Sequence, residues 1–416
     1  MGGIEPEYAI GPEGEDWRVP VSELQARLRK FSQKIAKQGL NYALIQTPVD
    51  LYYFTGSRQN GTLVIFSDSE KTPIYFVRRS LNRALWECGG TDCPIEIKQF
   101  PRMKDFPDVL TTLGCDQGPG MQLGELPHSF ADFFIKNLSQ LGPPVDITNL
   151  VHRQREVKSA WELEMMKEAA KVQYRMFEAI NEIGAEGLTE LDLVAQSDKI
   201  SRESGFGGIV QMRRYPMMCN RGVVLAGRSG GVTSFFDSAV GGAGPHPLAG
   251  FGAGFGKVKP NEPVLVDLVH VHRGYVVDAT RMFSKGKLEN HWLEKLDDMI
   301  EIRDTVLSGL GKGDDCSKVW EDGFSLAVEM GHENNLMGLP PDQSKFLGHS
   351  VGLQLDESPV VAKGFDRPLP VGGVMAIEPK VVYTEGSIGT EDTWLRTDDG
   401  MINISMGDSW PHTMEW

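Results

Sequence analysis

The feature that constrains this chain most is a pair of β-hairpins in its C-terminal half, each of which sets two acidic residues close together. The first is VLVDLVHVHRGYVVDATRMF, where Asp267 and Asp278 lie in β-rich runs on either side of a turn at residues 272–274. A hairpin that bends there pairs residues whose numbers add to about 545, so these two carboxylates face each other within a residue of register. Like charges directly opposite on a sheet destabilise it unless a proton or a cation lies between them.

The second hairpin, IEPKVVYTEGSIGTEDTW, repeats this arrangement. A turn at residues 384–386 gives a pairing sum of 769, which sets Glu378 opposite Glu391. His349, in GHSVG, lies between small residues in the same half of the chain. Two divalent cations would neutralise about four carboxylates, and oxygen ligands with one imidazole favour Mn, Co, Fe or Zn. The sequence therefore predicts a dinuclear metal site, against the alternative that each hairpin only exposes its acidic side chains to water.

Two domains are predicted, with a joint at Gly142-Pro143-Pro144. Residues 1–150 alternate short apolar runs with helical segments such as 22–38, which indicates an α/β domain. Residues 151–416 begin with a long amphipathic helix that opens in a capping box at Ser159, and continue into further helices and β-rich hairpins. That order indicates an α+β second domain.

Charge, cysteine usage and hydropathy exclude several classes of protein. The net charge is -15, and no basic run is long enough to follow a phosphate backbone, which argues against nucleic-acid binding. The five cysteines are scattered and form no CxxC pair, which argues against a disulfide framework or a thiolate zinc site. No stretch approaches the ~20 apolar residues of a membrane span, and the first residues lack the pattern of a secretory signal. A cytoplasmic protein with no membrane partner is expected.

Several motifs, in their order along the chain, resemble one enzyme family. In the C-terminal half they are VLVDLxxxxxGYxxDATRMF, GHSVGLQLDESP, AIEPK and GTEDTWLRTDDG; in the N-terminal half they are ELQARLRKF, GLNYALIQTPVDLYYFTG and REVKSAWELEMMKEAA. The chain resembles the pita-bread metallopeptidases, in the branch of aminopeptidase P, prolidase and creatinase. The resemblance implies a creatinase-like α/β domain over residues 1–150 and an α+β pita-bread catalytic domain over residues 151–416.

The resemblance also implies a role for each residue of the site. It makes the five metal ligands Asp267, Asp278, His349, Glu378 and Glu391, with Asp278 and Glu391 bridging two divalent ions. Such ions lower the pKa of a shared water and polarise the substrate carbonyl. Glu378 would carry the proton from the nucleophile to the leaving nitrogen. The expected protein is a metallohydrolase similar to the Xaa-Pro aminopeptidases and dipeptidases, acting on a small peptide or another small molecule as a homodimer.

Three positions depart from the family pattern. Asp356, in DESP, replaces a histidine of the substrate pocket, and an acid cannot donate the same hydrogen bond to an oxyanion unless it is protonated. Gly389 replaces an arginine that commonly lies two residues before the last ligand, so positive charge is expected to be missing from the pocket. His246, in GPHPLAGFGAGFG, is the candidate for the catalytic histidine that binds the substrate carbonyl, although it lies further from Asp267 in sequence than the family pattern leads us to expect.

These departures leave other functions open. A pocket that gains an acid and lacks a base favours a cationic or non-peptide substrate over an X-Pro peptide. A metal-dependent lyase or a non-peptide amidinohydrolase on the same fold, and a non-catalytic binding relative, are the alternatives. Removal of metal by a chelator followed by metal add-back separates enzyme from binder, because restored turnover of any substrate excludes a pure binder.

Overall fold

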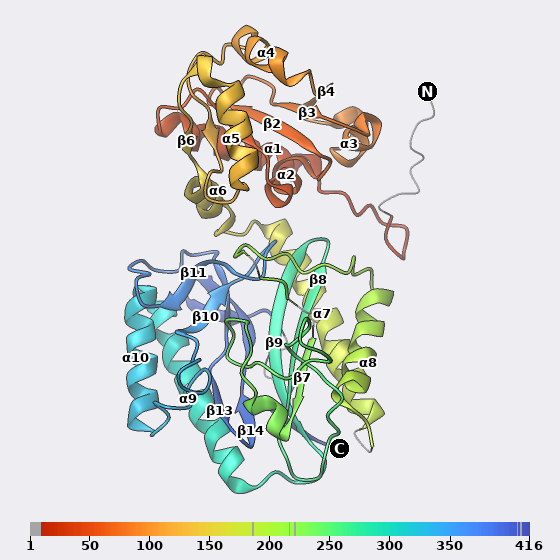
Figure 1. Ribbon diagram of the computed structural model, residues 1–416, viewed down its shortest axis with the longest axis vertical. Helices are drawn as coiled ribbons and strands as arrows, with labels where there is room; N and C mark the ends of the chain where they lie inside the picture. The colour runs from red at the N-terminus through yellow and green to blue at the C-terminus, as the bar shows by residue number, and fades with distance from the viewer. Residues whose placement is uncertain (1–9, 185–186, 216, 220–221, 406, 408–409) are drawn as a thin grey trace. The chain divides into compact units, whose positions relative to one another are not determined.

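Two units of sheet and helix divide the chain between Arg155 and Glu156 (Figure 1). The computed structural model describes residues 10–184, 187–215, 217–219, 222–405, 407 and 410–416. The prediction about a secretory signal concerns the first residues of the chain, and residues 1–9 lie outside the described ranges. Within the described ranges, no helix is both long and apolar enough to cross a bilayer.

The first unit is a six-stranded mixed sheet with helices packed on it. The strand order is β4-β3-β2-β1-β5-β6, and β1 to β3 pair antiparallel while β4, β5 and β6 join in parallel. The strands are β1 (Tyr42–Ile45), β2 (Gly61–Phe66), β3 (Ile74–Val77), β4 (Glu96–Gln99), β5 (Gly120–Met121) and β6 (Val145–Asp146). The helices are α1 (Val21–Lys37), α2 (Pro48–Thr55), α3 (Leu81–Glu87), α4 (Phe106–Thr112), α5 (His128–Asn137) and α6 (Thr148–Arg155). The α/β prediction is confirmed, and α1 matches the helix predicted at residues 22–38 within one residue.

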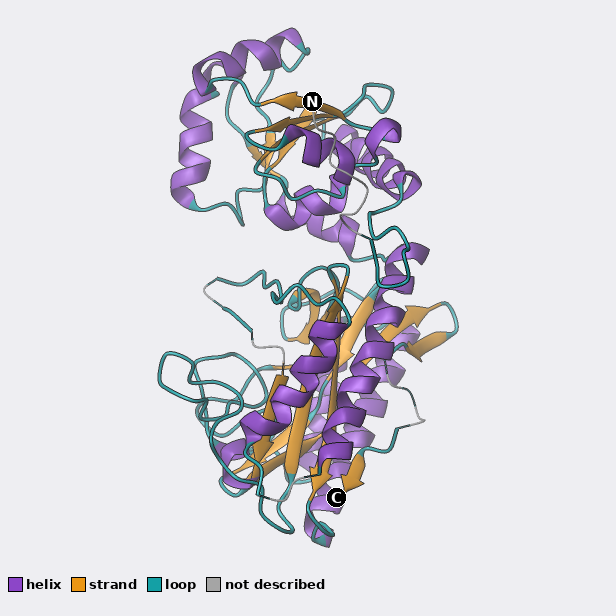
Figure 2. Ribbon diagram, turned by 90° about the vertical axis from the view of Figure 1, so that its right-hand side faces the viewer, coloured by secondary structure: helices purple, strands orange, loops and turns teal. Residues whose placement is uncertain are grey.

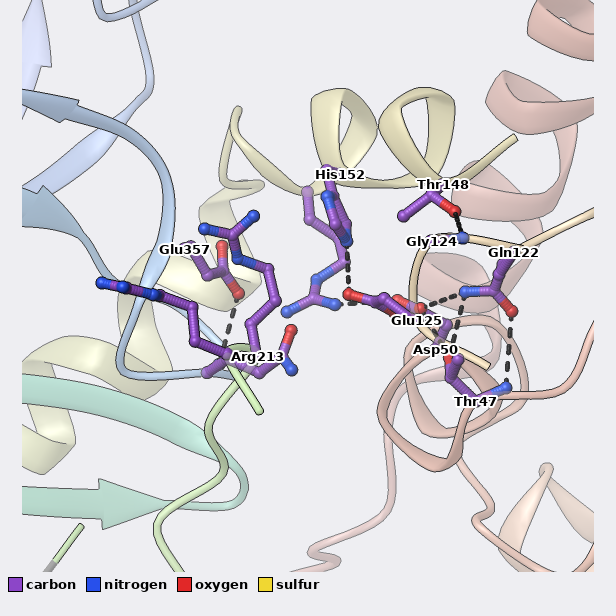
Figure 3. A network of polar contacts seen from close by, with 12 residues as sticks. Thr47, Asp50, Gln122, Gly124, Glu125, Thr148, His152, Arg213 and Glu357 are labelled. Carbon is purple, nitrogen blue, oxygen red and sulfur yellow. Dashed lines mark hydrogen bonds and ion pairs between the residues drawn. The ribbon is translucent and has the colours of Figure 1, made fainter. Parts of the chain in front are cut away.

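A buried polar network joins the start of α2 to β5 and α6 in this unit (Figure 3). The fully buried Asp50 accepts hydrogen bonds from Thr47 Oγ1 at 2.7 Å and from a guanidinium nitrogen of Arg155 at 2.8 Å. Gln122 donates to both Thr47 and Asp50. Because a buried carboxylate needs a compensating charge and donors, this network fixes the end of α6 against the sheet.

The second unit contains two larger sheets, each with a pair of helices on it (Figures 1 and 2). Helices α7 (Ala160–Ile183) and α8 (Glu190–Glu203) pack on the sheet β17-β9-β8-β7, and α9 (Asn290–Lys312) and α10 (Cys316–Glu329) pack against the sheet β11-β10-β12-β15-β16. The strands of the first sheet are β7 (Gly222–Ala226), β8 (Val264–His272), β9 (Tyr275–Ser284) and β17 (Thr413–Glu415). The strands of the second sheet are β10 (Phe346–Ser350), β11 (Glu357–Ala362), β12 (Val374–Ile377), β15 (Asp392–Thr397) and β16 (Gly400–Asn403). This arrangement confirms the α+β prediction.

Local sequence explains the ends of these elements. The predicted capping box is present at α7, because the Ser159 side chain accepts from the backbone of Glu162 while the Glu162 side chain accepts from the backbone of Ser159. A separate two-stranded ladder, β13 (Lys380–Tyr383) with β14 (Gly386–Gly389), forms the tip of the second predicted hairpin.

The two larger sheets meet along β9 and β15. The amide nitrogen of Thr280 donates to the carbonyl oxygen of Glu391 at 3.2 Å, and the amide nitrogen of Asp278 donates to the Thr393 hydroxyl at 3.0 Å. The Thr393 hydroxyl in turn donates to the carbonyl oxygen of Asp278 at 2.9 Å. These bonds bring an acidic residue of each predicted hairpin to the junction of the sheets.

Candidate metal centre

The first acidic hairpin bends as predicted, but its register differs by two residues. Strand β8 pairs with β9 so that Asp267 lies opposite Thr280 and Asp278 lies opposite Val269. The turn contains only Arg273 and Gly274, with φ of 49° and 96°. Two central residues with positive φ form the tight turn that matches strand twist, which moves the pairing sum to 547. The prediction that the two aspartates face each other directly is therefore wrong; they are diagonal neighbours on one face of the sheet.

The second acidic hairpin has the predicted register. Lys380 pairs with Gly389, and Ile377 pairs with Asp392, so both ladders keep the pairing sum of 769. Glu378 and Glu391 lie between these two pairs, at the points where the chain passes from one ladder to the other. Both carboxylates are buried.

His349 brings an imidazole to the same place from β10. Its Nε2 lies 3.2 Å from Glu378 Oε1 and 4.0 Å from Asp278 Oδ2. Asp278, His349 and Glu391 each offer a ligand atom, and these atoms lie within 4.8 Å of one another. The structure therefore brings three of the five predicted ligands together, with Glu378 in contact with His349 beside them.

Lys380 completes this cluster, and sequence reasoning missed it. Its side chain is fully buried, and its Nζ lies 2.7 Å from Glu378 Oε2, 2.7 Å from Glu391 Oε2 and 3.3 Å from Asp267 Oδ2. The signal was available in AIEPK, because a lysine two residues after one predicted ligand in an extended strand projects on the same side as that ligand. The expectation that Gly389 leaves the substrate pocket without positive charge is wrong for another reason, because Arg213 and Arg214 line the cavity beside this cluster.

Burial and mutual repulsion shift the pKa values of these acids. Burial, followed by Glu391 and Asp267, raises the pKa of Asp278 well above its usual range. Burial also raises the pKa of Glu391 to about 8, since the repulsion from Glu378 and Asp267 adds to it and Lys380 only partly opposes it.

Glu378 and His349 stabilise each other's charged forms. Burial acts against the charge on Glu378, but Lys380 and His349 outweigh it and lower the pKa of Glu378 to about 2. Burial likewise disfavours a charged imidazole, but the hydrogen bond and charge of Glu378 outweigh it and raise the pKa of His349 to about 9. Crowded buried acids of this kind need a cation to be stable in ionised form.

Two buried carboxylate oxygens indicate that a metal ion fits among these residues. Asp278 Oδ1 and Glu391 Oε1 have no hydrogen-bond partner among the residues that the structure describes. Buried carboxylate oxygens are rarely left without a partner, and an ion bound beside His349 would supply one. The donor set of two carboxylates and an imidazole suits a divalent first-row metal.

A cavity of about 100 Å³ opens onto this cluster. Its polar wall includes Asp267, Asp278, His349 and Glu378. The remaining wall is largely apolar and is formed by Met212, Met217, Val223, Phe236, Phe251, Val269, Phe346, Leu355 and Val360, with the charged residues Arg213, Arg214, Asp237 and Asp356 also present. A small ligand with an apolar part and a polar group fits such a site.

The two predicted pocket residues outside the ligand set have different positions. His246 lies on an exposed turn, where its carbonyl oxygen accepts from the amide of Ala249, and it does not line the cavity. Asp356 does line the cavity, but its carboxylate accepts hydrogen bonds from the backbone nitrogens of Arg213 at 2.6 Å and Arg214 at 2.9 Å. Asp356 therefore holds a segment of the cavity wall in place.

Replacing Asp356 by alanine should release this segment. The two backbone donors lose a charged acceptor, and hydrogen bonds to charged groups contribute about 1.5–3 kcal/mol each. We expect trypsin to cleave the native protein after Arg213 or Arg214 at least about tenfold faster, since cleavage follows local opening. Asp366→Ala is the control, because the exposed Asp366 accepts from the Ser317 side chain and, among the described residues, from no backbone nitrogen. Equal cleavage rates in the two variants would contradict the assigned role.

Comparison with known proteins places these features in one family. The sequence profile described as metallopeptidase family M24 matches residues 164–398, and the profile of the creatinase/prolidase N-terminal domain matches residues 27–157. The Xaa-Pro dipeptidase of Pyrococcus furiosus is 21% identical over 386 residues, covering 92% of this chain and 98% of the relative.

Solved structures give the same fold. A dipeptidase from Mycobacterium ulcerans superposes with a TM-score of 0.76 at 20% identity, covering 96% of this chain and 99% of its own. The X-Pro aminopeptidase from Thermotoga maritima superposes with a TM-score of 0.73 at 18% identity, covering 92% of this chain and 100% of its own. These matches confirm the predicted architecture of a creatinase-like N-terminal domain followed by a pita-bread domain.

Proposed function

This chain belongs to metallopeptidase family M24, and we propose that it is a metal-dependent dipeptidase that hydrolyses X-Pro substrates. Membership of the family implies a divalent metal cofactor. The single observation that carries the proposal is the meeting of three carboxylates and one imidazole on the wall of a small cavity, with Glu391 beside them and two buried carboxylate oxygens that have no partner among the described residues. The X-Pro preference rests on the similar Xaa-Pro dipeptidases and on the apolar cavity wall, which suits a proline ring.

The metal ligands are proposed from the ligand atoms that converge. Asp278, His349 and Glu391 would hold a Mn, Co, Fe or Zn ion, and Asp267 and Glu378 lie beside them. When bound, such an ion polarises the substrate carbonyl and activates a water at neutral pH. The further residues of the cavity then decide which substrate is accepted.

The protein's own groups would orient the substrate and move the proton. Glu378 lies on the cavity wall beside His349, and we assign it the transfer of a proton from the attacking water to the leaving proline nitrogen. Arg213 lines the same cavity and offers positive charge to the carboxylate of a dipeptide. The apolar wall with Phe236 and Phe251, whose rings stack at 4.5 Å, would exclude water around the proline ring. His246 is left out of the proposed site because it lies on an exposed turn.

A proline-release assay tests the proposed activity. Protein stripped with a chelator and reloaded with Mn²⁺ or Co²⁺ should release proline from an X-Pro dipeptide at least about 100-fold faster than the stripped protein, since a metal supplies several kcal/mol of transition-state stabilisation. The matched X-Ala dipeptide and the X-Pro amide should both be poorer substrates. Metal-dependent turnover of a betaine-like or guanidino compound without proline release would contradict the proposal and favour the lyase or amidinohydrolase alternative.

We also propose that the protein acts as a cytoplasmic homodimer. The five cysteines form no disulfide with one another, as expected of reduced thiols in the cytoplasm. Light scattering coupled to gel filtration should give twice the 46.0 kDa chain mass, and a monomer mass at micromolar concentration would contradict it.

A further inference from the structure

The Lys380 ammonium is placed where it uses every hydrogen atom that it carries. A lysine ammonium has three donors and no acceptor, and Nζ lies near one oxygen from each of Glu378, Glu391 and Asp267. These carboxylates belong to three separate segments: β8, the start of the β13–β14 ladder and its end. A cation at the centre of three acidic segments neutralises part of their repulsion, as a metal ion would.

The backbone around Lys380 leaves room for its aliphatic stem. Gly389 pairs directly with Lys380, and a Cβ at position 389 would lie 2.5 Å from Lys380 Cγ and 2.6 Å from the carbonyl oxygen of Pro379. A larger residue at 389 would therefore collide with the lysine stem and with the backbone. The glycine at this position and the lysine across from it form a matched pair.

The buried oxygens that lack a partner in the described part of the chain lie on the side of the cluster that includes His349. Asp267 Oδ2, Glu378 Oε2 and Glu391 Oε2 face the ammonium, and Glu391 Oε2 also accepts from the Thr280 hydroxyl at 2.8 Å. The buried oxygens without a partner among the described residues, Asp278 Oδ1 and Glu391 Oε1, belong to the group that includes His349. A second ion beside Asp267, Glu378 and Glu391 would stand among carboxylates that each already have one oxygen in contact with the ammonium.

We infer that this protein binds one divalent ion per chain, held by Asp278, His349 and Glu391, and that the Lys380 ammonium takes the place of a second ion beside Asp267 and Glu378. This inference rests on the proposed metal-dependent function and replaces its expected pair of ions with one ion and one ammonium. Lys380 would then act as a positioning residue, because its ammonium fixes the carboxylates of Glu378 and Glu391 without contacting the substrate.

Metal stoichiometry tests the inference without any activity assay. Native mass spectrometry and elemental analysis on the full chain saturated with Mn²⁺ should give one ion per wild-type chain. Lys380→Ala removes the ammonium and opens space among the three carboxylates, so this variant should bind two ions per chain. Lys380→Arg keeps a cation there and should stay at one ion.

A control separates the loss of this ammonium from the loss of any buried ammonium. Lys158 is also buried and pairs at 3.0 Å with Glu357, which is not one of the candidate ligands, so Lys158→Ala should still bind one ion. Two ions in the wild-type chain, or one ion in a folded Lys380→Ala variant, would overturn the role of Lys380 and leave the metallopeptidase proposal standing. No ion in any of the chains would overturn both. If Lys380→Ala does not fold, the count in the wild-type chain still decides.

Discussion

Asp278→Ala is expected to lose its bound metal and at least about 10³-fold in turnover of the substrate. Asp278 is buried, faces Glu391 and His349, and contributes an oxygen with no partner among the described residues, so its removal leaves the ion with too few ligands. Metal catalysis supplies several kcal/mol, and each 1.36 kcal/mol corresponds to a factor of ten in rate.

The same variant should change stability in a way that separates metal binding from folding. A ligand present at 1,000 times its dissociation constant stabilises the folded state by about 4 kcal/mol, so wild-type protein should melt at a higher temperature with Mn²⁺ than without it. Asp278→Ala should show no such gain, although its metal-free form should be at least as stable because it carries one fewer crowded acid. Asp298→Ala removes a carboxylate that pairs with His332 at 2.7 Å outside the cavity, and should keep the metal-dependent gain. Wild-type metal content in Asp278→Ala would contradict the assignment.

Arg281→Met is expected to destabilise the catalytic unit by about 3–5 kcal/mol, because it leaves a buried charge without its partner. Arg281 is fully buried and donates to both carboxylate oxygens of Asp392 at 3.0 and 3.2 Å and to the carbonyl oxygen of Glu391 at 3.0 Å. It thereby joins β9 to β15 beside two of the proposed ligands, so metal affinity should fall as well.

Thermal unfolding measures this effect directly. A loss of 3–5 kcal/mol in a unit of this size corresponds to a decrease of roughly 10 °C in Tm. Arg281→Met combined with Asp392→Leu should recover part of that loss, since the double variant leaves no buried charge unpaired. Lys318→Met is the control: Lys318 and its partner Asp322 are both exposed, which predicts a change of about 1 kcal/mol or less. Equal Tm values for Arg281→Met and Lys318→Met would contradict the role of the buried pair.

The spacing of apolar residues and the residue types at turns and helix ends made much of this structure predictable from sequence. The capping box at Ser159 and the amphipathic pattern that follows gave the start of α7, because both depend only on local residues. The register that sets Glu378 opposite Glu391 was predictable because the turn between β13 and β14, at Thr384 and Glu385, lies within the predicted turn at residues 384–386. The pairing of Asp267 was not, because a shift of the turn by one residue moves every pair by two.

The remaining features of the site depend on contacts between distant segments. Lys380 lies two residues after Glu378, which the local sequence shows, but its contact with Asp267 has no local signal, since Asp267 lies in a strand more than 100 residues earlier in the chain. The DESP motif identified Asp356 as a pocket residue. Its carboxylate accepts hydrogen bonds from the backbone of Arg213 and Arg214, which lie in a loop whose conformation no sequence periodicity predicts. His246 matches a motif yet lies on an exposed turn, because a glycine-rich segment leaves the direction of its side chains undetermined by sequence.

The most direct test of this account is an anomalous difference map from crystals grown with Mn²⁺. We predict a peak bounded by the side chains of Asp278, His349 and Glu391, with the Lys380 ammonium in place beside Glu378. A map with no peak among those three residues, from crystals saturated with the metal, would contradict it.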